Sequence, residues 1–211
     1  YQRPPALRLA LDDDEADLIK SAMDWQRELV SVEWIDPSVI HRIGPRLSDS
    51  IVGAAYEPES AKVDSYRMNL ALAAGAEKHG TEVLTRVVTG LRRSGNRVTG
   101  VDFETGGVDC DWVVLAMGPW SDACADWLGF PVPVRPMKGE RLLLRYAGDP
   151  LPCLISSPKR GHMISRLDGF LSVGSTGGRD YDDREAFAGI EFDRQPTETA
   201  QAELIRRALD V

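Results

Sequence analysis

Apolar and polar residues alternate along the first thirty residues in a pattern that predicts one strand followed by one helix. Residues 6–11 have the apolar content of a strand. The acidic run at residues 12–15 is typical of a helix N-terminus, where a carboxylate caps free backbone N–H groups. Apolar residues then recur at helical spacing, at Leu18, Ala22, Trp25 and Leu29. This spacing predicts a helix over residues 13–29.

The strongest helix signal in the chain covers residues 65–79. Asp64 is suited to cap its start, and Gly80 stands where a left-handed residue commonly ends a helix. One side of this helix is apolar and is formed by Tyr66, Leu70 and Ala73. Weaker signals precede it, because Asp36-Pro37 predicts a short helix and residues 51–56 predict a strand.

A β-hairpin is predicted downstream of this helix. Apolar residues alternate from Val87 to Leu91, residues 94–96 have the composition of a turn, and residues 97–103 predict the returning strand. A second turn, at Gly106-Gly107, then leads into an extended segment over residues 109–117.

The end of that segment is apolar at every position from Val113 to Ala116, which is typical of a strand covered on both faces of a parallel sheet. Residues 82–85 predict another strand directly after the helix over residues 65–79. We therefore predict that residues 82–85 and 112–117 pair in parallel.

Beyond residue 129, short apolar segments are separated by turns that contain proline or glycine, including Asp168-Gly169. The pattern predicts an antiparallel sheet and a last helix over residues 198–209. The predicted strands cover residues 140–146, 153–156, 162–166 and 170–173. Helices and mostly antiparallel strands in this order indicate the α+β fold class.

Composition excludes several classes of protein. The 211 residues are 43% hydrophobic and 27% charged, as in ordinary globular proteins. The net charge is −8 and the basic residues are spread along the chain, which argues against nucleic acid as a partner. No apolar run approaches the roughly 18 residues that a membrane span requires, so we expect none.

The three cysteines, Cys110, Cys124 and Cys153, have neither disulfide-framework nor metal-site spacing. They are expected to be small buried residues in a reducing compartment, which predicts a cytoplasmic protein without a metal site. The chain begins at Tyr1 with no initiator Met and no signal-type segment, and we expect it to be a piece of a longer protein.

Gly118 directly follows the apolar run that ends at Met117. In open α/β sheets, ligands bind at the carboxyl ends of parallel strands, where a glycine lets a ligand approach the backbone closely. Gly118 is therefore a candidate ligand contact. The alternative interpretation is a tight turn between a strand and a helix.

An ordered set of short motifs resembles the FAD-dependent D-amino acid oxidase superfamily, and within it the branch of glycine oxidase and sarcosine oxidase. The motifs lie at Asp64–Leu70, Gly80–Val83, Val113–Ser121, Pro136–Glu140, Ser165–Gly169 and Val173–Thr176. Each motif is weak alone, whereas their shared order is specific. The resemblance covers nearly the whole chain.

The resemblance implies an FAD-binding α/β domain and a substrate domain built on an antiparallel sheet. Residues 61–128 correspond to part of the FAD-binding domain, and residues 1–60 and 129–211 correspond to the substrate domain. The glycine-rich loop that holds the FAD pyrophosphate in this family is not found in this sequence. We therefore expect FAD in a full-length parent, and expect this chain alone to lack it and to be inactive.

Site residues are transferred from the resemblance position by position. Contacts with FAD are implied at Val87, Ala116, Gly118 and Trp120. The family often has Thr or Ser where Met117 stands, so no hydroxyl contact is transferred there. His162 occupies a position where relatives carry a substrate-facing Tyr, and Arg166 is suited to bind a substrate carboxylate. The alternatives are a solvated or core histidine and a structural ion pair, and no catalytic residue is assigned.

The function implied by the resemblance is oxidation of an amino acid or amine by hydride transfer to the flavin. One alternative is a flavoprotein of the same superfamily that acts on a hydroxy acid or polyol phosphate. Another is a binding or interaction domain without redox activity. A small-molecule amine or amino acid is the expected partner, and an uncovered sheet edge would allow a homodimer.

Overall fold

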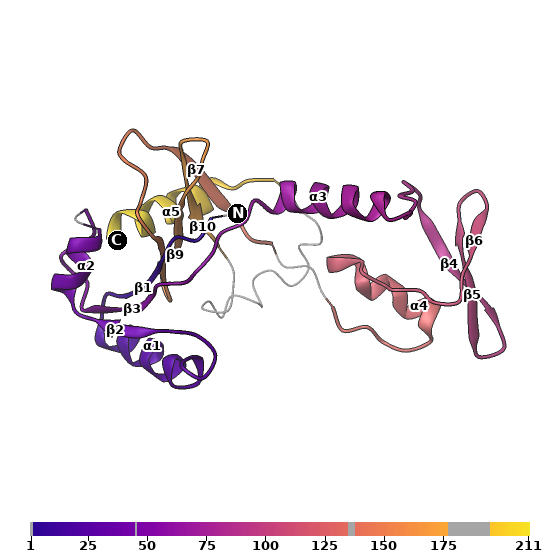
Figure 1. Cartoon of the computed structure of the whole chain (residues 1–211), viewed down its shortest axis with the longest axis horizontal. Helices are drawn as coiled ribbons and strands as arrows, with labels where there is room; N and C mark the ends of the chain where they lie inside the picture. The colour runs from indigo at the N-terminus through magenta and orange to yellow at the C-terminus, as the bar shows by residue number, and fades with distance from the viewer. Residues whose placement is uncertain (1, 45, 135–137, 177–194) are drawn as a thin grey trace. The chain divides into compact units, whose positions relative to one another are not determined.

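The computed structural model describes residues 2–44, 46–134, 138–176 and 195–211 (Figure 1). Its contacts divide the chain into two units. The large-sheet unit combines Tyr1–Asp64 with Lys138–Val211, and the small-sheet unit is Ser65–Met137. A single chain therefore leaves the first unit, builds the second, and returns to complete the first.

The large-sheet unit is organised around seven strands in the order β2-β3-β1-β8-β9-β10-β7. Their bounds are β1 Ala6–Ala10, β2 Glu33–Ile35, β3 Gly53–Glu57, β7 Arg141–Arg145, β8 Leu154–Ser157, β9 Gly161–Ser165 and β10 Phe170–Gly174. Neighbours are antiparallel except β1 and β8, which are parallel. The antiparallel sheet predicted beyond residue 129 is confirmed, and β1 joins it to the N-terminal strands.

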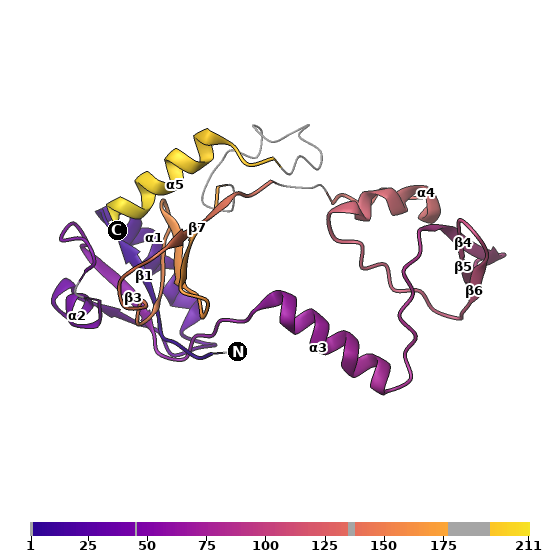
Figure 2. The ribbon, with the colours of Figure 1, turned by 90° about the horizontal axis from the view of Figure 1, so that it is seen from above.

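Helices cover both faces of this sheet. Ile40 of α2 (Pro37–Ile43) and Leu204 of α5 (Glu198–Asp210) belong to the main core cluster, together with Leu7, Met163 and Val173 of the sheet. Figure 2 shows α5 beside β7, a strand that it contacts. On the opposite face, α1 (Asp13–Gln26) closes a smaller cluster against Ala10 and Ala55.

The predicted apolar side of α1 is wrong, although the helix itself is confirmed. Ala16, Ile19 and Met23 are buried, whereas Leu18 and Trp25 are exposed and Leu29 lies beyond the helix end. Both sets recur at helical spacing, so the period of the pattern does not select between them. The choice depends on Ala10 and Ala55, which are small enough to receive the helix.

The small-sheet unit contains α3 (Ser65–Lys78) and a three-stranded antiparallel sheet in the order β4-β5-β6. The strands are β4 Val88–Ser94, β5 Arg97–Phe103 and β6 Gly107–Asp109, which confirms the predicted hairpin. A 3₁₀-helix, η1 (Gly118–Cys124), and the short α4 (Ala125–Leu128) follow.

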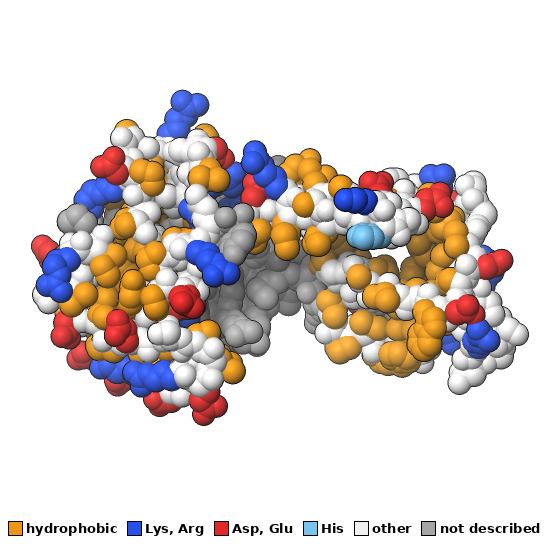
Figure 3. Space-filling model, in the orientation of Figure 1, with side chains coloured by type: hydrophobic (Ala, Val, Ile, Leu, Met, Phe, Trp, Pro, Cys, Tyr) orange, Lys and Arg blue, Asp and Glu red, His pale blue; other side chains and the backbone are white. Residues whose placement is uncertain are grey.

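The predicted parallel pair is wrong for the described structure, because neither residues 82–85 nor residues 112–117 form a strand. A strand requires a backbone hydrogen-bonding partner, and the described residues offer none to either segment. Trp112 and Val114 are each 89% exposed, and no residue of α3 is buried. Figure 3 shows apolar side chains gathered on the surface of this unit.

Candidate functional site

Three of the four candidate FAD contacts lie together at the start of η1. Ala116 and Gly118 are exposed, and Trp120 is 47% exposed. Val87 is exposed and lies directly before β4, where its carbonyl accepts a hydrogen bond from Glu104 N at 3.3 Å. The described contacts do not bring Val87 to the other three residues.

Gly118 has a φ of +56°, in the left-handed region that disfavours side chains. A Cβ atom added to it meets no atom within 4 Å. The backbone conformation therefore favours glycine here, while the space beside it stays open to an approaching group. Accessible backbone at Gly118 and the exposed apolar side chains beside it are suited to contact one part of a large planar cofactor. These residues offer no helix N-terminus of the kind that binds a pyrophosphate.

Arg166, the predicted carboxylate contact, makes a bidentate ion pair in the turn between β9 and β10. Its Nε and Nη2 donate to the Asp168 carboxylate at 3.0 Å and 2.7 Å. The same contact raises the pKa of Arg166 and lowers the pKa of Asp168. This ion pair gives the Arg166 guanidinium a structural role within the turn. Substrate binding by Arg166 stays a prediction.

His162 lies in a row of residues that crosses five strands of the large sheet. Strand register places one residue of each strand in line, in the order Arg8, Ser156, His162, Gly174 and Arg141. Residues in register on neighbouring strands share a face of the sheet. We call this set the His162 row.

The His162 row lies on the sheet face that α5 does not cover. Its flanking residues Leu142, Met163 and Val173 belong to the main core cluster, so the row faces the other way. None of its side chains belongs to either apolar cluster of the described residues. The unit thus places a mostly polar row on the sheet face opposite the main core cluster, the face on which α1 also packs.

Gly174 lies in the His162 row between His162 and Arg141, and it carries no side chain. A Cβ atom added to Gly174 would lie 2.9 Å from Arg141 Cβ and 3.3 Å from His162 Cε1. His162 and Arg141 therefore flank the same position from two sides. Burial, followed by the positive charge of Arg141, lowers the pKa of His162 below 6.5. The imidazole is therefore neutral near pH 7 and is able both to donate and to accept a hydrogen bond.

The arginines of the row were not identified from the sequence. Arg141 lies before Leu142 and Leu144, which face the core, so alternation already places it on the other face. No sequence signal connects it with His162, however, because the register of strands distant in sequence is set by tertiary packing. Among the described residues, neither the Arg8 nor the Arg141 side chain makes a hydrogen bond or ion pair.

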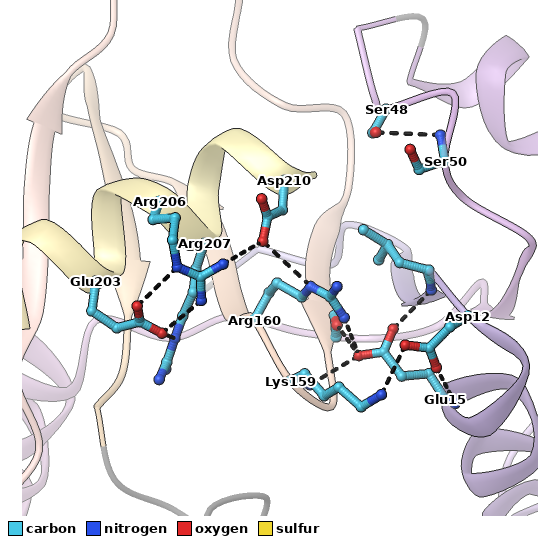
Figure 4. Close-up of polar contacts among 12 residues, drawn as sticks. Asp12, Glu15, Ser48, Ser50, Lys159, Arg160, Glu203, Arg206, Arg207 and Asp210 are labelled. Carbon is cyan, nitrogen blue, oxygen red and sulfur yellow. Dashed lines mark hydrogen bonds and ion pairs between the residues drawn. The ribbon is translucent and has the colours of Figure 1, made fainter.

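A buried carboxylate holds the hairpin that carries His162. Glu15 accepts hydrogen bonds from Arg160 Nη1 at 2.6 Å, Ser157 Oγ at 3.1 Å and the Lys159 backbone N–H at 3.2 Å. Figure 4 shows Arg160 between Glu15 and Asp210 of α5, with Lys159 beside Asp12. The turn between β8 and β9 is thus tied to both α1 and α5.

The core-facing side holds a cavity of about 150 Å³ lined mainly by apolar residues and by Cys153. Burial raises the pKa of the Cys153 thiol to about 11, so this thiol stays protonated and poorly reactive. The described residues contain no cluster suited to a metal ion. None of the described helices has the length and apolar character needed to cross a membrane.

Comparison with known proteins agrees with the observed fold. The model of the DAO family, described as FAD dependent oxidoreductase, matches residues 1–211. Glycine oxidase of Pseudomonas putida is 34% identical over 166 residues, which cover 78% of this chain and 44% of that protein. Hydrogen cyanide synthase subunit HcnC of Pseudomonas protegens is 30% identical over 149 residues, covering 69% of this chain and 35% of that protein.

Solved structures show the same relationship. Glycine oxidase from Bacillus cereus superposes with a TM-score of 0.85 at 25% identity, covering all of this chain and 55% of that one. L-proline dehydrogenase from P. horikoshii shares the fold with a TM-score of 0.83 at 19% identity, covering all of this chain and 56% of that one. The chain spans 35–56% of the length of these relatives, and the α+β fold is confirmed. By family model, sequence and fold, the chain belongs to the DAO family of FAD dependent oxidoreductases.

Proposed function

We propose that this chain is part of an FAD-dependent enzyme that oxidises an amino acid or amine. The observation that carries the proposal is the His162 row of the large sheet, in which His162 and Arg141 approach each other on either side of Gly174. A neutral imidazole beside a guanidinium suits a small substrate that combines a carboxylate with an amine. The similarity to glycine oxidases supports the same chemistry.

Bound FAD would supply the oxidant, accepting a hydride from the substrate carbon that carries the nitrogen. The amine loses a proton to solvent in the same oxidation, and water then hydrolyses the resulting imine. In this division of labour, the residues of this chain bind and orient the substrate. His162 exchanges hydrogen bonds with the polar end of the substrate.

The two units have different parts in this proposal. The small-sheet unit contains most of the predicted FAD-binding part at residues 61–128 and would contact the flavin through Val87, Ala116, Gly118 and Trp120. Residues 1–60 and 129–211 provide the substrate side through the large sheet. The exposed apolar residues of the small-sheet unit support this arrangement, because an incomplete layer needs further protein or cofactor to cover it. Cytoplasmic location and a homodimer through the sheet edge stay predictions.

A second candidate function is oxidation of a hydroxy acid or polyol phosphate. One component of the anaerobic glycerol-3-phosphate dehydrogenase of Escherichia coli is 33% identical over 122 residues, which cover 54% of this chain and 22% of that protein. A phosphate would also find suitable donors in the guanidinium group of Arg141.

Both candidates are tested on the natural full-length protein. Flavin absorbance should show bound FAD, and glycine, sarcosine, proline or a D-amino acid should bleach it anaerobically and yield an oxo acid. Glycerol 3-phosphate and glycolate serve as the matched non-amine substrates. Reduction by glycerol 3-phosphate alone would favour the second candidate, and protein that binds no flavin would exclude both.

A further inference from the structure

We infer that Arg141 is a specificity-determining residue, which binds a carboxylate of the substrate beside His162, across Gly174 on the neighbouring strand. The inference rests on the proposed function and adds to it a named residue and ligand group. No sequence motif identified Arg141, and strand register alone brings it to the site.

The position of Arg141 is set by β10, which separates it from His162. Strands in a sheet lie about 4.8 Å apart, so His162 and Arg141 have Cα atoms about 10 Å apart. Gly174 occupies the strand between them and places no side chain in this gap. A Cβ atom added to Gly174 would lie 2.9 Å from Arg141 Cβ and 3.3 Å from His162 Cε1, so glycine lets these two side chains approach each other above β10.

The charge of Arg141 is not balanced within the described protein. Among the described residues its guanidinium forms neither a hydrogen bond nor an ion pair. Arg145, four residues further along the chain at the other end of β7, differs because its guanidinium lies 5.9 Å from the centre of the Phe170 ring. One arginine of this strand is therefore packed on an aromatic ring, while the other is available to an anion.

A carboxylate is the group that this arrangement suits. The planar guanidinium forms two parallel hydrogen bonds with a carboxylate, and His162 on the other side contributes a neutral donor. The ligand carboxylate could be the α-carboxylate of an amino acid or a second carboxylate of a dicarboxylic substrate. Both carboxylates would bind the guanidinium in the same way. Substrates with one carboxylate and with two carboxylates therefore distinguish them.

The test compares Arg141→Gln, Arg141→Lys and the matched control Arg145→Gln in the natural full-length protein. KM and kcat are measured for glycine, aspartate and methylamine, and the dissociation constant of glycolate is measured by calorimetry. Arg141→Gln should weaken carboxylate binding about 10- to 100-fold, the loss of a charged hydrogen-bonded pair, with little change in kcat. Arg141→Lys should recover part of the affinity, and Arg145→Gln should change little.

The substrate series identifies which carboxylate is bound. An equal rise in KM for glycine and aspartate assigns the α-carboxylate, whereas a rise for aspartate alone assigns the second carboxylate. Methylamine, which has no carboxylate, should be unaffected by Arg141→Gln. Unchanged KM values and glycolate affinity, or an equal effect of Arg145→Gln, would overturn the inference.

Failure of the inference and failure of the proposed function give different results. If the wild-type protein oxidises none of the amines, the proposed function fails, yet glycolate calorimetry still reports on Arg141. If the amines are oxidised and Arg141→Gln binds glycolate like wild type, the inference alone fails. Thermal unfolding of each variant separates a binding defect from misfolding, because a purely structural arginine would lower the melting temperature without changing glycolate affinity in folded protein.

Discussion

The large-sheet unit closes its apolar cores, whereas the small-sheet unit leaves much of its apolar surface exposed. Leu7, Ile19 and Leu204 of the first unit are almost fully buried. In the second unit, Tyr66 is 72% and Leu70 is 52% exposed on α3, the helix with the clearest sequence signal. The difference shows that a strong local pattern forms a helix without supplying the partner that its apolar side requires.

The small-sheet unit is therefore expected to need additional protein before it binds a cofactor, which is the largest effect that we predict. This 211-residue chain should purify without colour, should oxidise no amine, and should give no saturable change in flavin fluorescence at micromolar FAD. FAD is long and flexible, and ordering it requires more contacts than Val87 and the Gly118 region offer. Saturable binding at micromolar concentration or tighter would mean that the cofactor site is closed within this chain.

The buried Glu15 should be the most sensitive side chain of the large-sheet unit. Its exposed fraction is 1%, and Glu15→Ala leaves the largely buried Arg160 guanidinium without this carboxylate partner. We expect urea unfolding to show a loss of about 3–5 kcal/mol. The control Asp14→Ala removes an exposed carboxylate of the same helix turn and should cost about 1 kcal/mol or less. Equal effects of the two substitutions would contradict a structural role for the Glu15 network.

Two leucine substitutions, one in each unit, compare how strongly the packing of each unit contributes to stability. Leu204 is fully buried, so Leu204→Ala should lower the free energy of unfolding by about 2–5 kcal/mol. Leu70→Ala on exposed α3 should change it by about 0.5 kcal/mol or less in this chain. Urea denaturation measures both. A large loss for Leu70→Ala would show that α3 already packs against a partner in solution.

Two substitutions of Gly118 distinguish its role in the backbone conformation of the turn from a role in admitting the cofactor. Gly118→Val in the full-length protein should cost about 1–2 kcal/mol, because a β-branched residue is strained at a φ of +56°. Gly118→Asn tolerates the left-handed conformation but still adds a side chain. If the glycine admits FAD, both variants should lower the flavin absorbance per folded protein. Normal flavin content in Gly118→Asn would leave the glycine as a turn residue.

The smallest expected effect is the pH dependence that His162 contributes to stability. Its pKa in the folded protein is lowered below 6.5, so the unfolded state binds more protons as the pH falls through this value. Stability from neutral His162 is therefore present above pH 6.5 and decreases on acidification. The urea midpoint should fall more between about pH 7.5 and pH 5.5 for wild type than for His162→Gln. Arg141→Gln, which removes a nearby positive charge, should reduce this dependence, and identical pH profiles for all three proteins would exclude it.

Most helices and antiparallel strands were predicted from the sequence because their signals are local. Asp12 caps α1 through its side chain, which accepts a hydrogen bond from the Glu15 backbone N–H. The β4–β5 hairpin follows from a turn at residues 94–96 between alternating strands. Two features were not predicted, because both depend on partners distant in sequence. One is the buried side of α1, and the other is the lack of strands in the described segments at residues 82–85 and 112–117.

The residues of the candidate site also fall into those that the sequence identified and those that it did not. Sequence motifs selected His162 and Gly118, and the left-handed conformation of Gly118 agrees with the preference for glycine at that turn. Arg166 was selected for its chemistry, yet its guanidinium is held by Asp168, a neighbour only two residues away. Arg141 and Gly174 were missed, because no local pattern indicates which strands lie beside β9.

The sequence by itself determined the family, the order of elements and the local conformation of turns and caps, since each depends on residues close together in the chain. Tertiary structure alone decided that β1 joins β8, that α1 buries Met23 rather than Trp25, and that Arg141 stands across Gly174 from His162. The physical reason is strand register. Register is fixed by the simultaneous burial of apolar side chains from many distant strands, and a shift of one residue would turn Arg141 toward the core.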